Sequence, residues 1–283
     1  MKDVIQALIC PVCGAPMAES EGGRSILCEG GARGNRTNRR HCFDRASSGY
    51  VNLAPPSQSL SGDSKEAVRS RTRFLDTDCY APIRDAVCEM IDRYCGDGLV
   101  VDAGCGEGYY TAAMAKHASG VIGFDLSKFG IDAAAKRARR EGLDNTLLAV
   151  SGIYEMPLRD ECAKGVVSLF APCAEEEFSR VLQHGGVVIA VGAGEDHLLG
   201  LKRAIYDEVY KNTPREDMPR SMNLLEEKRV TFSITLTNGD AIRDLFSMTP
   251  YYYRTSEGDI AKLAALDRLE TEIDVTVSVY QKA

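Results

Sequence analysis

The middle of the chain alternates between short apolar runs and amphipathic stretches. The apolar runs predict buried strands, and the stretches around them carry apolar residues every three to four positions, which predicts helices. This alternation predicts an α/β fold, a doubly wound Rossmann-like parallel sheet that binds its ligand at the carboxyl ends of its strands. The expected strands are Leu99–Ala103, Gly120–Asp125, Leu147–Val150, Val166–Phe170 and Val187–Val191, and the expected helices cover residues 83–94, 109–117, 132–141, 175–182 and 197–210.

Two later segments have a different period. Apolar residues alternate with polar ones from Val230 to Leu236 and again from Ile273 to Val279. Such alternation is typical of strands with one face in water, so we expect antiparallel edge strands beside the parallel sheet.

The front of the chain has less apolar periodicity. Residues 54–73 are polar, rich in serine and proline, and basic toward their end, which indicates a linker or flap. We therefore expect a small module over residues 1–53, a linker or flap over 54–82, and the α/β domain over 83–283.

A glycine-rich turn follows the first predicted strand of the α/β domain. It contains Gly104, Gly106 and Gly108, with Asp102 two residues ahead, and Asp125 ends the next strand about 20 residues further on. A dinucleotide site needs G-x-G-x-x-G, and its last position here is a tyrosine. The tighter G-x-G-x-G resembles motif I of class I S-adenosylmethionine-dependent methyltransferases. A strand-to-helix turn without a ligand is the alternative, but loop, strand, helix and second acid all agree with a nucleoside site.

Composition limits the remaining possibilities. The 283 residues suffice for one α/β domain with a small appended module. No apolar run has the length of a membrane-spanning helix and the first residues lack a signal-peptide pattern, so we expect a cytoplasmic protein without a membrane partner. Ten cysteines in such a chain favour metal ligands or buried thiols over disulfides.

Cysteines near the N-terminus have the spacing of a zinc site. Cys10 and Cys13 form a C-x2-C pair, Cys28 follows, and the fourth ligand is either His41 or its neighbour Cys42. A redox pair or merely buried cysteines are the alternative. However, this segment has too few apolar residues to fold without a stabilising metal ion or cross-link. We expect a closed, structural zinc site, so that a chelator unfolds this module and leaves the body folded.

The charge is divided unevenly along the chain. Residues 1–75 carry 11 Lys and Arg against 7 Asp and Glu, whereas the rest carries 23 against 34. A basic front on an acidic body suggests that the front meets a polyanion, although chance can produce such a fluctuation in a short window. The cluster Arg33, Arg36, Arg39 and Arg40 favours the polyanion, but no role can be assigned to the Arg- and Gly-rich insertion 29–40 that holds it.

Several blocks together resemble one family. They are His41-Cys-Phe-Asp with Gly49-Tyr-Val-Asn-Leu, the glycine loop, Gly123-Phe-Asp-Leu-Ser-Lys and Phe170-Ala-Pro-Cys. This series looks like the bacterial guanine-N1 methyltransferases that modify a hairpin loop of large-subunit ribosomal RNA, and the likeness covers essentially the whole chain. The resemblance implies zinc on Cys10, Cys13, Cys28 and His41. It implies S-adenosylmethionine contacts from Tyr80, Glu107, Gly108, Asp125 and His197, beside motif I residues Asp102, Gly104 and Gly106.

The chemistry leaves some roles open. Guanine N1 carries a proton at neutral pH and lies on the Watson–Crick edge, so the base must be unpaired and must lose this proton. A carboxylate in the loops after the strands or His197 could accept it, and the sequence does not choose. The tyrosines at 251–253 could stack on a base, but a partly buried β segment is the simpler interpretation.

Two other functions compete with RNA methylation. A small-molecule methyltransferase would share the sheet and motif I without needing a basic zinc module. A zinc-bearing RNA-binding protein with an inactive methyltransferase domain would lose the cofactor loop, which is intact here. Which guanine is methylated, whether the chain forms a homodimer, and whether its activity confers antibiotic resistance stay open.

Overall fold

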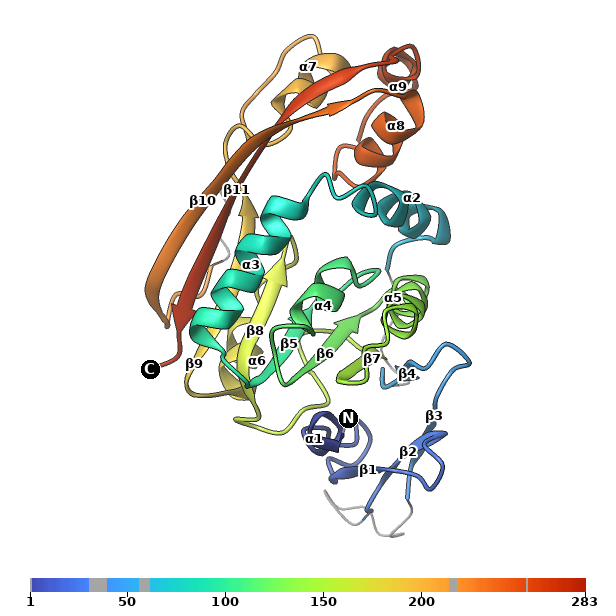
Figure 1. Cartoon of the computed structure of the whole chain (residues 1–283), viewed down its shortest axis with the longest axis vertical. Helices are drawn as coiled ribbons and strands as arrows, with labels where there is room; N and C mark the ends of the chain where they lie inside the picture. Colours follow the sequence, from blue (N-terminus) through green and yellow to red (C-terminus); the bar gives the residue numbers. More distant parts are fainter. Residues whose placement is uncertain (1, 31–39, 56–61, 214–217, 253) are drawn as a thin grey trace.

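The chain forms two sheets. The computed structural model describes residues 2–30, 40–55, 62–213, 218–252 and 254–283. Within these residues lie a three-stranded antiparallel sheet near the N-terminus and an eight-stranded mixed sheet with helices on both faces (Figure 1). The small sheet consists of β1 (Met17–Glu19), β2 (Ser25–Cys28) and β3 (Cys42–Asp44).

Five parallel strands form the centre of the large sheet, in the order β7–β6–β5–β8–β9. They are β5 (Leu99–Ala103), β6 (Gly120–Asp125), β7 (Thr146–Val150), β8 (Ala163–Leu169) and β9 (Leu182–Ala193). The five predicted strands are confirmed, although β8 and β9 begin earlier than their most apolar stretch indicates. The strand order reverses at β5. Doubly wound sheets bind their ligands at this switch point, at the carboxyl ends of the strands, and we call this region the crevice.

An antiparallel pair extends the sheet beyond β9. β10 (Asn223–Leu236) and β11 (Leu269–Gln281) pair along almost their full length, with Val230 opposite Val275, and β11 runs antiparallel to β9. The prediction from alternating residues is therefore confirmed. At the opposite edge the short strand β4 (Val51–Asn52) pairs parallel with β7.

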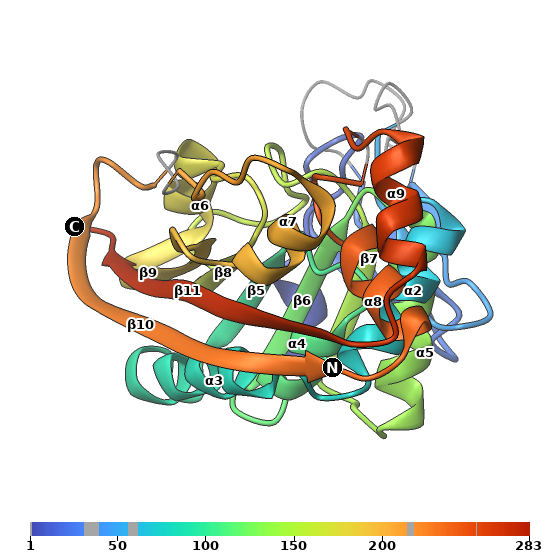
Figure 2. The same ribbon diagram turned by 90° about the horizontal axis from the view of Figure 1, so that it is seen from above.

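Helices cover both faces of the sheet (Figure 2). In β5, Val100 belongs to the core beneath α3 (Ala81–Tyr94), whereas Val101 belongs to the core beneath α1 (Lys2–Gln6) and α6 (Glu175–Val181). Adjacent residues of a strand point to opposite faces, so a continuous apolar run is what a strand buried on both faces requires. The remaining helices are α2 (Lys65–Leu75), α4 (Tyr109–Met114), α5 (Lys128–Arg140), α7 (Leu199–Ile205), α8 (Gly239–Ser247) and α9 (Glu257–Ala264).

Helix ends differ from the predicted ones for local reasons. α5 begins at Lys128 rather than near residue 132, because the Ser127 hydroxyl accepts a hydrogen bond from the Gly130 amide and caps the helix. α7 ends at Ile205 rather than near residue 210. The Lys202 ammonium donates to the Tyr210 carbonyl, so the chain after the helix folds back along it.

The segment predicted as a linker or flap contains the helix α2. Ser64 caps its N-terminus, Phe74 and Leu75 are fully buried, and the Arg73 guanidinium pairs with the Asp244 carboxylate of α8 at 2.6 Å. Most residues of this segment are polar and the apolar face of α2 is short, so the composition of the segment suggested a linker.

The N-terminal module shares its core with the large sheet. Val4 and Leu8 pack in one apolar cluster with Val101 and Ile122, and Leu8 forms an isolated bridge with Leu158. Removal of the module would therefore expose apolar surface of the sheet. That a chelator unfolds this module and leaves the body folded stays a prediction.

Candidate cofactor and metal sites

The glycine loop leaves β5 and enters α4 at the crevice. Gly104, Gly106 and Gly108 all have positive φ, at 89°, 55° and 81°. At Gly108 a side chain is also excluded by space, because a Cβ there would lie 2.7 Å from the Cβ of Ala134 on α5. The loop thus needs glycine both for its backbone conformation and for close packing against the next helix.

Asp125 ties this loop to the end of β6. Its carboxylate accepts one hydrogen bond from the Gly106 amide at 3.0 Å and another from the Ser127 amide at 2.7 Å. Burial raises the pKa of Asp125, while these two backbone donors oppose that shift. Each carboxylate oxygen has a second lone pair, so the group can still accept hydrogen bonds from a ligand.

Two buried polar atoms beside the loop lack a hydrogen-bond partner. Among the described residues, Asp102 Oδ1 and the Tyr110 hydroxyl are the buried side-chain nitrogen or oxygen atoms in this state. Burial raises the pKa of Asp102 to about 7, although the Thr111 hydroxyl donates to its other oxygen at 2.6 Å. Unsatisfied buried polar atoms are costly, so their position at one loop fits a polar ligand such as the amino-acid end of S-adenosylmethionine.

A segment that the sequence assigned to the linker lies over the same loop. The Ser127 hydroxyl donates to the Asp63 carbonyl at 2.8 Å, and a Cβ on Gly62 would collide with the Ser127 backbone. Arg71 of α2 reaches the loop, since its Nη1 would lie 3.6 Å from a Cβ on Gly106, and it pairs with Asp63 at 2.5 Å. The basic character of residues 54–73 was visible in the sequence, but its contact with the cofactor loop was not.

Three aromatic rings pack in a row at the carboxyl end of the parallel strands. Tyr80, at the start of α3, packs at 6.4 Å from the ring of His197, which in turn stacks on Phe170 at 5.9 Å. Ala171 abuts the glycine loop, because a Cβ on Gly104 would lie 2.9 Å from the Ala171 Cβ. These contacts bring Tyr80 and His197 to the end of the sheet that holds the predicted motif I residues.

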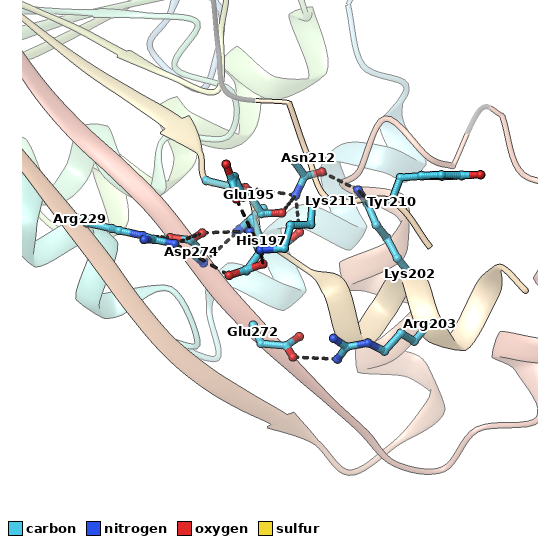
Figure 3. Close-up of polar contacts among 12 residues, drawn as sticks. Glu195, His197, Lys202, Arg203, Tyr210, Lys211, Asn212, Arg229, Glu272 and Asp274 are labelled. Atoms are coloured by element: carbon cyan, nitrogen blue, oxygen red, sulfur yellow. Dashed lines mark hydrogen bonds and ion pairs between the residues drawn. The ribbon is translucent and has the colours of Figure 1, made fainter. Parts of the chain in front are cut away.

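The imidazole of His197 has a defined hydrogen-bonding role. The Asp274 amide donates to its Nδ1 at 3.3 Å, so in the neutral ring the proton resides on Nε2. Burial lowers the pKa of His197 to about 4, which keeps the ring neutral near pH 7. Figure 3 shows Asp274 between this ring and Arg229, whose guanidinium binds the Asp274 carboxylate at 2.7 Å. His197 is therefore arranged as a hydrogen-bond donor rather than as the proton acceptor that the sequence left open.

Tyr251, in the tyrosine cluster at residues 251–253, is partly buried, and one face of its ring is covered. The Lys202 ammonium lies 5.2 Å above its ring, and its hydroxyl donates to Asn212 at 2.8 Å. Tyr251 is partly buried as expected, but it lies in a turn, so the prediction of a β segment is wrong at this residue; Tyr253 lies outside the described residues.

Four ligand atoms of the N-terminal module meet in one place. One atom each from Cys10, Cys13, Cys28 and His41 lies within 4.8 Å of the other three. His41 Nδ1 is 3.5 Å from Cys10 Sγ and 3.4 Å from Cys28 Sγ, and the sulfurs of Cys13 and Cys28 are 3.8 Å apart. Tetrahedral zinc with ordinary bond lengths separates its ligands by about 3.5–3.8 Å, so the site fits this ion and has no open position for catalysis.

The structure decides between the two candidates for the fourth ligand. The Cys42 side chain is exposed and lies near the Asp44 carboxylate at 3.5 Å, whereas His41 faces the three cysteines. Burial raises the pKa of Cys10 to about 11, so this thiol stays protonated near pH 7 unless a metal ion replaces the proton.

Comparisons with known proteins agree with this geometry. A family model described as "Methyltransferase domain" matches residues 100–186, and one described as "RlmA, N-terminal", a zinc ribbon, matches residues 8–61. Together with the strand order, in which the antiparallel strand β11 lies between β9 and β10, they define a class I S-adenosylmethionine-dependent methyltransferase with an N-terminal zinc ribbon.

Similar chains identify the family. A 23S rRNA (guanine(748)-N(1))-methyltransferase of Streptomyces fradiae is 30% identical, and the alignment covers 98% of this chain and 96% of that protein. A Bacillus subtilis protein provisionally named 23S rRNA (guanine-N(1)-)-methyltransferase is 29% identical over 96% of both chains. A Micromonospora griseorubida protein, provisionally given the same enzyme name, is 32% identical over 70% of both chains. The chain belongs to the family of 23S rRNA guanine-N1 methyltransferases.

The metal site yields a prediction. The purified protein should contain one zinc ion per chain, and Cys13→Ser and His41→Ala should each abolish this stoichiometry because a closed site needs all four ligands. Cys88→Ser, which changes a buried thiol of α3, and Cys42→Ala should retain the ion. Metal analysis of the four variants checks this. Zinc retained by His41→Ala but lost from Cys42→Ala would mean that the ligand assignment is wrong.

Proposed function

We propose that this protein transfers a methyl group from S-adenosylmethionine to N1 of a guanine in a hairpin loop of large-subunit ribosomal RNA. The observation that carries the proposal is the likeness to a named 23S rRNA guanine-N1 methyltransferase over nearly the whole chain, zinc ribbon included. A small-molecule methyltransferase would have no use for the ribbon, and the complete glycine loop argues against an inactive domain.

The cofactor side of the crevice has a residue for each part of the methyl donor. We assign the ribose to Asp125, whose carboxylate is held by Gly106 and Ser127, and the amino-acid end to the region of Asp102. Gly104, Glu107 and Gly108 form the loop that the donor lies against. Tyr80 and His197, whose rings pack against each other, complete the expected cofactor contacts.

The reaction places few demands on covalent chemistry. The bound cofactor supplies a methyl group activated by a sulfonium. Guanine N1 gives its proton to a carboxylate in the loops after the strands, its electron pair forms the new bond to the methyl carbon, and the sulfur–methyl pair remains on sulfur. The protein must align the two groups and exclude water. His197 contributes a neutral Nε2–H donor at this place, suited to a carbonyl or carboxylate oxygen.

Basic residues of α5 extend the RNA surface beyond the ribbon. Ser47 and Ser48 of the N-terminal module line a groove of about 570 Å³ together with Lys136, Arg139 and Arg140. Asp132 joins the two sides, because it accepts from Ser48 at 2.8 Å and pairs with Lys136 at 2.7 Å. Arg139 and Arg140 are exposed and have no ion-pair partner in the described part of the chain. Both guanidinium groups are therefore available to phosphates.

This groove adds α5 to the basic front that the sequence predicts to meet a polyanion. Of the arginine cluster predicted to contact phosphates, Arg33, Arg36 and Arg39 lie outside the described residues, and Arg40 is exposed. Their role stays a prediction, as does a homodimer. No described helix is long and apolar enough to span a membrane. A ribosomal RNA substrate also agrees with the expected cytoplasmic location.

Methylation mapping tests the proposal. Unmodified 23S rRNA incubated with the protein and S-adenosylmethionine should gain one N1-methylguanosine, located by mass spectrometry of nuclease fragments. Asp125→Ala should gain little, because it removes charge-assisted hydrogen bonds of about 1.5–3 kcal/mol each. Labelling of small metabolites but not of RNA would favour the small-molecule alternative. If calorimetry detects no binding of S-adenosylmethionine, the alternative of an RNA-binding protein with an inactive methyltransferase domain is favoured.

Cofactor binding should release protons near neutral pH. In the free protein, burial and the nearby Asp125 and Glu107 carboxylates together raise the pKa of Asp102 to about 7. A ligand of net positive charge lowers this pKa, so binding at pH 7 should release on the order of half a proton, and affinity should fall as the pH drops below 7. Calorimetry in buffers of different ionisation enthalpy measures the release. Asp102→Asn should show much less, and an unchanged release in this variant would exclude Asp102 as its source.

Neutralising the α5 arginines should weaken RNA binding and its dependence on salt. For each phosphate that the double variant Arg139→Gln/Arg140→Gln no longer neutralises, the slope of log affinity against log salt concentration should become shallower by about 0.7–0.9. Affinity for S-adenosylmethionine should not change. Arg93→Gln/Arg243→Gln changes the net charge equally on α3 and α8 and is the control. Equal slopes for the two double variants would show that the groove does not bind RNA.

A further inference from the structure

The carboxyl end of β8 presents an exposed phenylalanine in an unfavourable backbone conformation. Phe170 has φ of 52°, in the left-handed region, and its side chain is 47% exposed. Its conformation is held from both sides. The Phe170 amide donates to the Val191 carbonyl at 3.0 Å, and the Ser168 hydroxyl donates to the Ala171 carbonyl at 3.1 Å. A glycine would meet the backbone requirement without strain, so the fold itself gives no reason for an aromatic residue here.

A second residue with a strained backbone lies next to His197, on whose ring Phe170 stacks. The described part of the chain has four non-glycine residues with positive φ, and one of them, Leu198 at 60°, directly follows His197. Phe170 stacks on His197 with an angle of 22° between the rings. Strained backbone of this kind gathers at functional sites, where the surrounding structure maintains it. Phe170 and Leu198 therefore mark the surroundings of His197 as a working surface.

This surface lies where a methyl acceptor would enter. Phe170 follows the strand next to β5, and its neighbour Ala171 touches the glycine loop at Gly104. His197 covers one face of the phenyl ring, and the large exposed fraction indicates that another part of the ring is open. Tyr251 is less exposed than Phe170, and the Lys202 ammonium lies over one face of its ring.

We propose that Phe170 is the stacking surface for the target guanine, with His197 supporting the ring from behind. The inference rests on the proposed function. A guanine methylated at N1 must leave its pair and its neighbours in the RNA, so it loses stacking that the protein has to replace. An exposed aromatic ring held firmly at the carboxyl end of a strand supplies this stacking, and it orients the Watson–Crick edge toward the cofactor loop. Phe170 is thus a specificity and positioning residue that touches the substrate base.

Substitutions separate stacking from structure. Phe170→Tyr should keep kcat/KM for RNA within about threefold, whereas Phe170→Leu should lower it about tenfold or more, the usual effect of losing one base–aromatic stack. Phe170→Gly should methylate RNA as poorly as Phe170→Leu. Its melting temperature should not fall below that of the wild type, because glycine relieves the strained backbone. Affinity for S-adenosylmethionine should stay constant in all three. Phe129→Leu, at a phenylalanine of α5 that is 50% exposed, is the matched control.

A direct probe of the stack is available because the chain has no tryptophan. Phe170→Trp introduces a single indole at the proposed contact. Its emission should be quenched by the 23S rRNA fragment that the wild-type protein methylates. It should be quenched much less by the same fragment with an abasic site at the methylated guanine. Phe129→Trp should not distinguish the two RNAs.

The outcomes are distinct. If the wild-type protein methylates 23S rRNA while Phe170→Leu keeps its kcat/KM, or if the indole at position 170 responds equally to both fragments, Phe170 does not hold the base and the proposed function stands. If the wild-type protein methylates no ribosomal RNA, the proposed function fails and this inference fails with it. Loss of activity in Phe170→Leu together with guanine-dependent quenching supports both.

Discussion

The carboxylate of Asp125 is the contact on which the candidate site depends. It joins three separate segments, because it accepts from the glycine loop at Gly106 and from the turn at Ser127, whose hydroxyl in turn binds the backbone at Asp63. The loop after β5, the end of β6 and the segment leading into α2 therefore form one rigid unit. Such a unit is in place before a ligand arrives, which reduces the entropic cost of binding.

The parts of the fold predicted from the sequence are those determined by local patterns. Apolar runs predict the buried strands of the parallel sheet, and the alternation of apolar and polar residues predicts the edge strands β10 and β11. The glycine loop and Asp125 have fixed spacings, and the cysteine pair at Cys10 and Cys13 has a short one. In each case the physical constraint acts between residues close in the sequence.

What the sequence did not reveal depends on contacts between distant segments. α2 was hidden in a polar stretch, since its apolar face is short and its partner α8 lies about 170 residues away, as in the Arg73–Asp244 pair. The choice of His41 over Cys42 depends on which side chain the β2–β3 pairing turns inward. The role of His197 depends on one amide of β11, and the strain at Phe170 leaves no mark in composition.

The shared core of the zinc module and the large sheet has a consequence for synthesis on the ribosome. Leu8 emerges early, but its bridge partner Leu158 lies 150 positions later, and at about 5–20 residues per second their encounter is delayed by roughly 8–30 s. Until the strands of the large sheet have been synthesised, the apolar side chains of α1 can pack only within the N-terminal module. A metal-bound ribbon folds from its own first 50 or so residues. Zinc supply during translation thus bears on how long the nascent chain exposes an unfinished hydrophobic surface.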